Sequence, residues 1–269
     1  MEQTHNRNLL GVQKLTLGDS FLSGEEFDFA EYEGKPQKTY LICSTGRSGS
    51  TLLSSLLTTS GVMGAPHEYF HVAGHREPLI ERFNIPAYQP DMMDKYFDTI
   101  IKYRTSPNGV FGLKAHITQC LKYFNNGFIK SYFGDIKFIF MLRRNTIAQA
   151  ISLTIAGQTG KWTSHGTEKK QATYDFDKIN GSFGLTSYQN ALWERVFKAN
   201  KITPHVIFYE DLLEAPTEQI QMIADFIGVD TKISIDLASA GLNKQATAQN
   251  REWEERFADE ILRIFQIPC

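Results

Sequence analysis

One short segment near the start of the chain limits the possible folds more than any other feature of the sequence. An apolar run over residues 40–43 is followed directly by a glycine-containing stretch from Ser44 to Thr51, and then by leucines at helical spacing up to about Gly61. A continuous apolar strand is typical of a parallel sheet, because such a strand is buried on both faces. The segment therefore predicts a buried strand, a glycine loop and a helix.

Two further strand and helix pairs follow along the chain. Residues 136–142 predict a strand that leads into a helix over 146–158, and residues 205–209 predict a strand that is followed by a helix over 216–227. Strands that alternate with helices form parallel sheets through crossover connections. We therefore expect an α/β protein with a P-loop-like three-layer fold, in which helices flank a central parallel sheet.

The length of 269 residues, 42% of them hydrophobic, is sufficient for one sizeable domain. We expect this domain to span residues 38–269 and residues 1–37 to form an N-terminal arm or lid. The net charge of −2 argues against nucleic acid as a partner, because such binding relies on a strong positive field. Any anion site must then be a local cluster of basic residues.

Three cysteines, an odd number without close spacing, indicate free thiols in a reducing compartment. The amino-terminal residues lack a basic start followed by an apolar stretch, and no run of about 18 apolar residues suggests a transmembrane segment. The sequence therefore predicts a cytoplasmic protein.

The glycine loop has the features of an anion site. A turn that enters a helix offers unpaired backbone N–H groups and the positive end of the helix dipole. The residues that we expect to contribute amide groups, hydroxyl groups or positive charge are Thr45, Gly46, Arg47, Ser48, Gly49, Ser50 and Thr51. This pattern predicts that the loop binds phosphate or sulfate.

The same loop departs from the nucleotide-binding signature G-x-x-x-x-G-K-S/T. Ser50 stands where that signature has lysine, and the basic residue lies inside the loop as Arg47. The next strand leads into Arg143, where a magnesium-dependent enzyme often has aspartate. Glu210 and Asp211 could still supply an acidic site, so a P-loop kinase and a non-catalytic nucleotide-binding protein remain alternatives.

These motifs resemble the sulfotransferases that use 3′-phosphoadenosine 5′-phosphosulfate. The resemblance covers roughly residues 38–265 and is strongest to the bacterial branch that includes trehalose 2-sulfotransferase and the nodulation-factor sulfotransferases. It implies transfer of a sulfuryl group to a hydroxyl of a carbohydrate or glycolipid acceptor, with no metal. It also suggests a homodimer.

The resemblance assigns the donor contacts residue by residue. It implies that the loop with Arg47 binds the 5′-phosphosulfate and that the 3′-phosphate contacts come from one of two adjacent arginines and a serine on the following helix. It also implies an adenine neighbour and a basic residue near the carboxyl end. The matching residues of this sequence are Arg143, Arg144, Ser152, Tyr209 and Lys244.

The acceptor hydroxyl must lose a proton, and two residues are candidates for the base. The stretch around Glu68 resembles the segment of the bacterial branch whose glutamate is the base. Lys114 and His116 instead resemble the Lys-x-His pattern of the cytosolic enzymes, in which the histidine is the base. We favour Glu68, and expect Lys114 with Arg47 to stabilise charge on the departing phosphate.

Residues 67–71 also fit the zinc hydrolase signature H-E-x-x-H, with His67 and His71 as ligands and Glu68 as the base. That signature requires two histidines one turn apart on a helix that is already under way. Pro66 permits only the start of a helix at this point, so we treat the zinc hydrolase as the weakest alternative.

Overall fold

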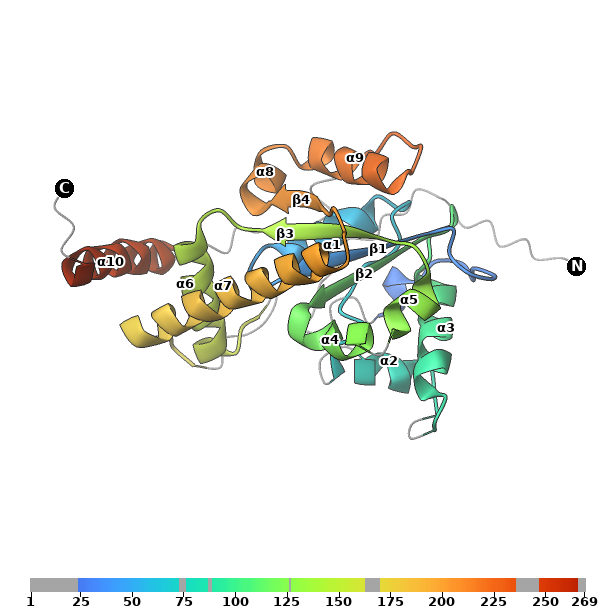
Figure 1. Ribbon diagram of the computed structural model, residues 1–269, viewed down its shortest axis with the longest axis horizontal. Coiled ribbons are helices and arrows are strands. Elements are labelled where there is room, and N and C mark those ends of the chain that lie inside the picture. Colours follow the sequence, from blue (N-terminus) through green and yellow to red (C-terminus); the bar gives the residue numbers. More distant parts are fainter. Residues whose placement is uncertain are drawn as a thin grey trace, which may run out of the picture.

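A parallel sheet of four strands organises the protein. The computed structural model describes residues 24–72, 76–86, 89–125, 127–162, 170–235 and 247–265. The strands have the spatial order β2-β1-β3-β4, and their bounds are β1 Lys38–Ser44, β2 Val110–His116, β3 Ile136–Leu142 and β4 His205–Phe208. Because all pairs are parallel, the carboxyl ends of the strands meet at one edge of the sheet (Figure 1).

Helices cover both faces of the sheet. Alternate residues of β1 point to opposite sides, so that Tyr40 and Ile42 join one apolar core while Leu41 and Cys43 join the other. The first core is closed by α1 (Ser50–Thr59), α8 (Tyr209–Glu214) and α9 (Pro216–Ile227). The second is closed by α2 (Glu77–Arg82), α3 (Met92–Arg104), α4 (Ile117–Asn125), α5 (Phe128–Phe133) and α7 (Phe176–Ala199). The predicted three-layer α/β fold is confirmed.

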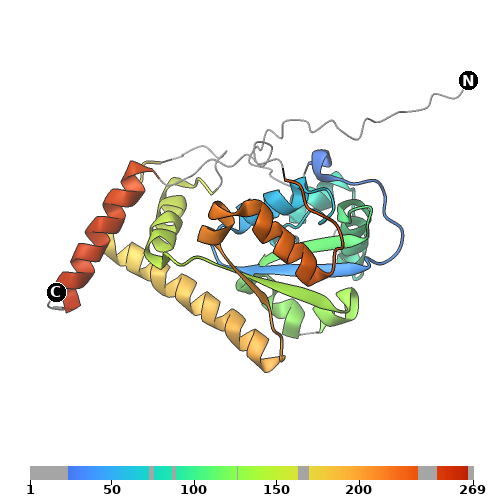
Figure 2. The same ribbon diagram turned by 90° about the horizontal axis from the view of Figure 1, so that it is seen from above.

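Three helices extend beyond the sheet. The long helix α7 packs with α6 (Thr146–Thr159) and α10 (Ala248–Phe265) around a separate small core that contains Ile151, Ile179 and Trp253. Figures 1 and 2 show α6, α10 and the start of α7 beyond the sheet, while the later part of α7 runs along it. Among the described residues, no helix is both long and apolar enough to cross a bilayer.

Most predicted element bounds agree with the structure, but one strand was predicted one residue too long and another strand was missed. The strand predicted over residues 205–209 ends at Phe208, because Tyr209 begins α8 with two acidic residues in its first turn. The strand β2 was not predicted, since Gly112 and Lys114 interrupt its apolar run. Gly112 is required there, because a Cβ atom would lie 2.5 Å from the hydroxyl oxygen of Tyr40.

A buried ion pair holds residues 24–37 against the domain. Asp28 Oδ1 lies 3.0 Å from Nε of Arg104, whose side chain is fully buried on α3, and Arg82 pairs with the same carboxylate. Phe27 adds a buried aromatic ring. Residues 1–23 of the predicted arm lie outside the described residues, so the limits of that arm stay a prediction.

Candidate active site

The turn between β1 and α1 has the backbone of an open anion cradle. Gly49 adopts φ 94°, and a Cβ atom there would lie 2.4 Å from Cδ2 of Tyr209. Arg47 also has a positive φ of 62°. No side chain caps the amino end of α1, so its first amide groups are available to a ligand. Glycine is thus required at position 49 both by the positive φ of the backbone and by the closeness of the Tyr209 ring.

Arg47 extends from this turn toward α6. Its Nε donates to Oγ of Ser152 at 2.8 Å, and its Nη1 donates to the carbonyl oxygen of Trp162 at 2.5 Å. Burial, together with the nearby charge of Arg143, lowers the pKa of Arg47 to about 10. The guanidinium therefore stays positive at neutral pH in a setting where an anion would relieve the repulsion between the two arginines.

Gln149 holds the loop between β1 and α1 through two hydrogen bonds, and the sequence alone did not identify this residue. This buried side chain of α6 donates through Nε2 to Oγ1 of Thr45 at 2.9 Å and to the carbonyl oxygen of Gly46 at 2.8 Å. Its position one helical turn before Ser152 was the only sequence signal that could have suggested a contact with the same loop.

The two adjacent arginines after β3 have different surroundings. Arg144 forms a bidentate pair with Asp211, with distances of 2.5 Å and 2.8 Å between nitrogen and oxygen. Arg143 instead lies over the ring of Tyr209, with 4.9 Å between guanidinium carbon and ring centroid, and donates to the carbonyl oxygen of Arg47 at 3.4 Å. Arg143 thus faces the loop, whereas Arg144 faces a carboxylate.

Two buried side-chain atoms with donor capacity beside the loop have no hydrogen-bond partner among the described residues. These are Nε of Arg143 and Oγ of Ser48. Burying such groups without a partner is unfavourable by about 1 to 3 kcal/mol each, so they are usually satisfied by a ligand or water. Two unsatisfied groups with donor capacity beside a helix amino terminus suit a ligand with phosphate or sulfate groups.

Glu68 is held next to the carboxyl end of β2. The amide of Lys114 donates to the carbonyl oxygen of His67 at 2.9 Å, which attaches the loop before Glu68 to the strand. The buried ammonium of Lys114 then lies 3.0 Å from Oε1 of Glu68 and donates to Oγ1 of Thr51 at 3.3 Å. Lys114 therefore connects the predicted base with the first turn of α1.

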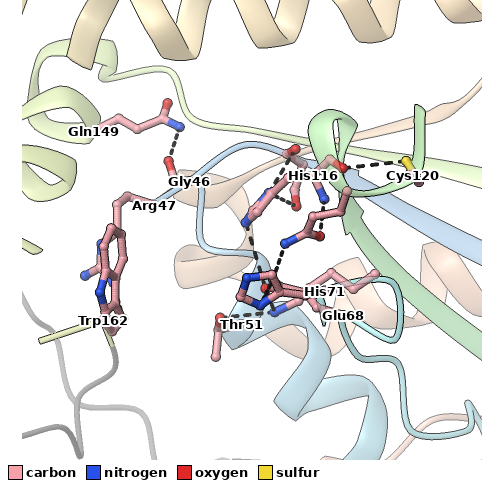
Figure 3. Close-up of polar contacts among 12 residues, drawn as sticks. Gly46, Arg47, Thr51, Glu68, His71, His116, Cys120, Gln149 and Trp162 are labelled. Carbon is pink, nitrogen blue, oxygen red and sulfur yellow. Dashed lines mark hydrogen bonds and ion pairs between the residues drawn. The ribbon is translucent and has the colours of Figure 1, made fainter. Parts of the chain in front are cut away.

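His116 belongs to the same cluster. Its Nε2 lies 3.8 Å from Oε1 of Glu68, and its Nδ1 lies 3.1 Å from the carbonyl oxygen of Ser44, to which Nε1 of Trp193 also donates. Figure 3 shows Glu68, His71, His116 and Thr51 in one group of polar contacts and Arg47 in another. Both candidate bases thus lie in one cluster.

The residues of the H-E-x-x-H signature do not form the helix that a zinc site of this type needs. His67 pairs with Leu113 as an isolated bridge, and the chain then turns, with the amide of His71 donating to the carbonyl oxygen of Glu68 at 2.8 Å. The carboxylate of Glu68 faces Lys114 at 3.0 Å. The last predicted donor contact, Lys244, lies outside the described residues.

The acidic residues that kept a kinase possible are engaged elsewhere. Glu210 accepts from the backbone amides of Arg144 at 3.0 Å and Asn145 at 3.2 Å, and Asp211 binds the side chain of Arg144. They stabilise the turn between β3 and α6. This arrangement does not present two carboxylates to the loop between β1 and α1.

Comparison with known proteins establishes the class of enzyme. Residues 39–260 match the Stf0 sulphotransferase family. The chain belongs to this family and is a sulfotransferase, so the kinase and zinc hydrolase alternatives are set aside.

Two curated relatives are similar to this chain over most of its length. The chain is 28% identical to trehalose 2-sulfotransferase of Mycobacterium tuberculosis, in an alignment that covers 84% of this chain and 97% of the relative. It is 25% identical to trehalose 2-sulfotransferase of Mycolicibacterium smegmatis, over 83% of this chain and 96% of the relative. Among solved structures, it resembles the sulfotransferase domain of the Synechococcus olefin synthase, with a TM-score of 0.40, 18% identity, and coverage of 86% of this chain and 98% of that one.

Proposed function

We propose that this enzyme transfers a sulfuryl group from 3′-phosphoadenosine 5′-phosphosulfate to a hydroxyl of a carbohydrate or glycolipid. The observation that carries the proposal is the contact of one buried ammonium, that of Lys114, with both the first turn of α1 and the carboxylate of Glu68. A loop suited to anions and a group suited to proton removal are thereby adjacent. The names of the two mycobacterial relatives support a sugar acceptor.

In the proposed reaction, the acceptor oxygen forms a bond to sulfur while the bond between sulfur and the bridging phosphate oxygen breaks. The hydroxyl proton passes to Glu68, and 3′-phosphoadenosine 5′-phosphate leaves. By analogy with phosphoryl transfer, the protein contributes mainly by positioning groups and stabilising charge. Arg47, Lys114 and the amides at the start of α1 supply positive charge and donors for the leaving phosphate.

We assign the 3′-phosphate contact to Arg143 rather than Arg144. The support is that Arg143 carries a buried Nε without a partner in the described part of the chain, whereas Arg144 is bound to Asp211 through Nη1 and Nη2. Tyr209 would then be the neighbour of the adenosine, since its ring lies against Arg143. Contacts remote from the reacting sulfur can orient the donor and so favour the transition state.

The wider setting is also a proposal. Cys43 and Cys120 are free thiols buried in the core, in keeping with a reducing compartment such as the cytoplasm. We propose that the enzyme works there, without a metal, as a homodimer. Sedimentation equilibrium would report the mass in solution, and a monomer at micromolar concentration would contradict the dimer.

The donor assignment is tested by calorimetric melting with 3′-phosphoadenosine 5′-phosphate in the presence of a chelator. A ligand at 100 times its dissociation constant stabilises the folded state by about 2.7 kcal/mol, which is readily seen as a higher Tm. ATP with magnesium is the contrast. The proposal would be overturned if ATP with magnesium raised the Tm and 3′-phosphoadenosine 5′-phosphate did not.

The acceptor and the base are tested by product analysis. We expect mass spectrometry to detect a sulfated product in a panel of free disaccharides and glycolipids that includes trehalose. Glu68→Gln should lower kcat while leaving the Kd of 3′-phosphoadenosine 5′-phosphate unchanged. His116→Asn is the matched variant, and a larger loss of kcat for His116→Asn than for Glu68→Gln would transfer the role of base to the histidine.

A further inference from the structure

Gln119 links the carboxylate of Glu68 to the end of β2. Its Oε1 accepts from the backbone amide of His116 at 2.9 Å, and its Nε2 donates to Oε2 of Glu68 at 2.7 Å. The first bond fixes which end of the carboxamide is which, because the backbone amide can bond only to the oxygen. The NH2 group must therefore point to the carboxylate.

The bond to His116 by itself is an ordinary helix cap. His116 immediately precedes α4, and Gln119 is the third residue of that helix, where a glutamine or glutamate side chain commonly reaches back to the capping residue. Either residue type would serve this purpose. The cap does not need a donor on the far side of the side chain, so the bond to Glu68 is the feature to explain.

The carboxylate of Glu68 has a different neighbour on each oxygen. Oε1 lies 3.0 Å from Nζ of Lys114 and 3.8 Å from Nε2 of His116, while Oε2 receives the bond from Gln119 and lies 4.0 Å from Nδ1 of His71. Gln119 is the neighbour in this set that donates a hydrogen bond and carries no charge at any pH. It can therefore hold the carboxylate without adding a positive charge, which would also interact with a bound sulfate group.

We propose that Gln119 is a positioning residue, which acts through Glu68 by fixing the orientation of its carboxylate and favouring its ionised form. The proposal rests on the proposed function, in which Glu68 removes the acceptor proton. A hydrogen bond to a charged group typically contributes enough to change a rate by about tenfold to a hundredfold when it is lost. Gln119 lies outside the loop between β1 and α1, so donor binding should not depend on it.

The decisive variant is Gln119→Glu, because it keeps the acceptor for the amide of His116 and replaces the donor by a second carboxylate. Two adjacent carboxylates resist ionising together, so Glu68 should take up its proton at a higher pH. The acidic limb of the profile of kcat/KM against pH should move up by about one unit or more, and kcat near neutral pH should fall about tenfold or more. The Kd of 3′-phosphoadenosine 5′-phosphate should stay close to the wild-type value, and the loss of stability should stay near the roughly 1.4 kcal/mol that one pKa unit implies, so that the variant remains folded.

Two controls separate positioning from folding. Gln119→Met keeps a side chain of similar size but removes both hydrogen bonds. This variant should therefore lower the Tm as well as kcat. In a Glu68→Gln background, adding Gln119→Glu should cause no further loss of kcat, because the group on which it acts is already gone. An unchanged pH profile in Gln119→Glu, or an equal additional loss in the Glu68→Gln background, would overturn the inference.

An infrared titration keeps this test independent of the reaction. The carboxylate band that differs between wild type and Glu68→Gln reports the ionisation of Glu68 without any substrate. That band should titrate at a higher pH in Gln119→Glu, and the same midpoint as in wild type would refute the positioning role. Failure of the wild type to bind 3′-phosphoadenosine 5′-phosphate would instead refute the proposed function, so the two failures are distinguishable.

Discussion

Adjacent residues of the same type can have different roles, as Arg143 and Arg144 illustrate. We predict that Arg143→Ala weakens binding of 3′-phosphoadenosine 5′-phosphate by about tenfold to a hundredfold, the effect of losing a hydrogen bond to a charged group. Arg144→Ala is the matched control and should change the Kd less than about threefold, since Arg144 is exposed and is already paired with the partly exposed carboxylate of Asp211. Isothermal titration calorimetry measures both, and the reverse order of effects would contradict the assignment.

Gly49 gives a second prediction about a single residue. Alanine at this position must adopt φ 94° and displace the ring of Tyr209, so Gly49→Ala should lower stability by more than the strain alone, which is about 1 to 2 kcal/mol. Gly61→Ala isolates the strain, because Gly61 has φ 72° and nothing within 4 Å of an added Cβ. Urea denaturation compares the two variants, and equal losses of stability would show that the contact with Tyr209 is unimportant.

The sequence was sufficient to identify residues within a motif but not contacts between distant segments. The loop from Thr45 to Thr51 was visible because its residues are contiguous. Gln119 was not, because its partner Glu68 lies 51 positions away. The choice between Arg143 and Arg144 likewise depends on Asp211, which lies on a different helix.

The attachment of residues 24–37 depends on a charge pair that is shielded from water. Removing one partner of such a pair leaves the other buried and unpaired, which destabilises a protein by about 3 to 5 kcal/mol. We therefore predict that Asp28→Asn lowers the free energy of unfolding by an amount in this range, because Arg104 is fully buried.

The matched control for Asp28→Asn is Glu31→Gln. Glu31 pairs with Lys102 at the surface, with both side chains well exposed, so its loss should change the free energy of unfolding by less than about 1 kcal/mol. Chemical denaturation measures both. Equal effects would mean that the ion pair of Asp28 contributes no more than a surface pair.

Elements with clear boundary signals were predicted well. The helix α9 begins at Pro216 and ends before Gly228, which has φ 84°, and both residues are standard signals of helix ends. The strand β2 was harder to recognise, because Lys114 interrupts its apolar run although that lysine is buried. The groups that allow this burial lie outside the strand. Lys114 is accommodated by Glu68 and Thr51, which come from other parts of the chain.

The packing of the whole domain determines how readily its two buried thiols react. Cys43 and Cys120 are fully buried, and burial raises the pKa of each thiol above its ordinary value. We predict that both react with Ellman's reagent at pH 8 only when the protein unfolds. A Cys269→Ser variant restricts the reaction to these two, and its rate should rise with urea in parallel with the unfolded fraction. Rapid labelling without urea would contradict the packing described here.

All four strands end at the same edge of the sheet, and the residues proposed to hold the donor lie at or just after the carboxyl ends of β1, β2, β3 and β4. No contiguous fragment shorter than most of the domain contains Thr45, Lys114, Arg143 and Tyr209 together. A nascent chain would therefore gain its affinity for the donor only once β4 has joined the sheet. Retention on an immobilised nucleotide analogue should thus distinguish finished molecules from partly folded ones.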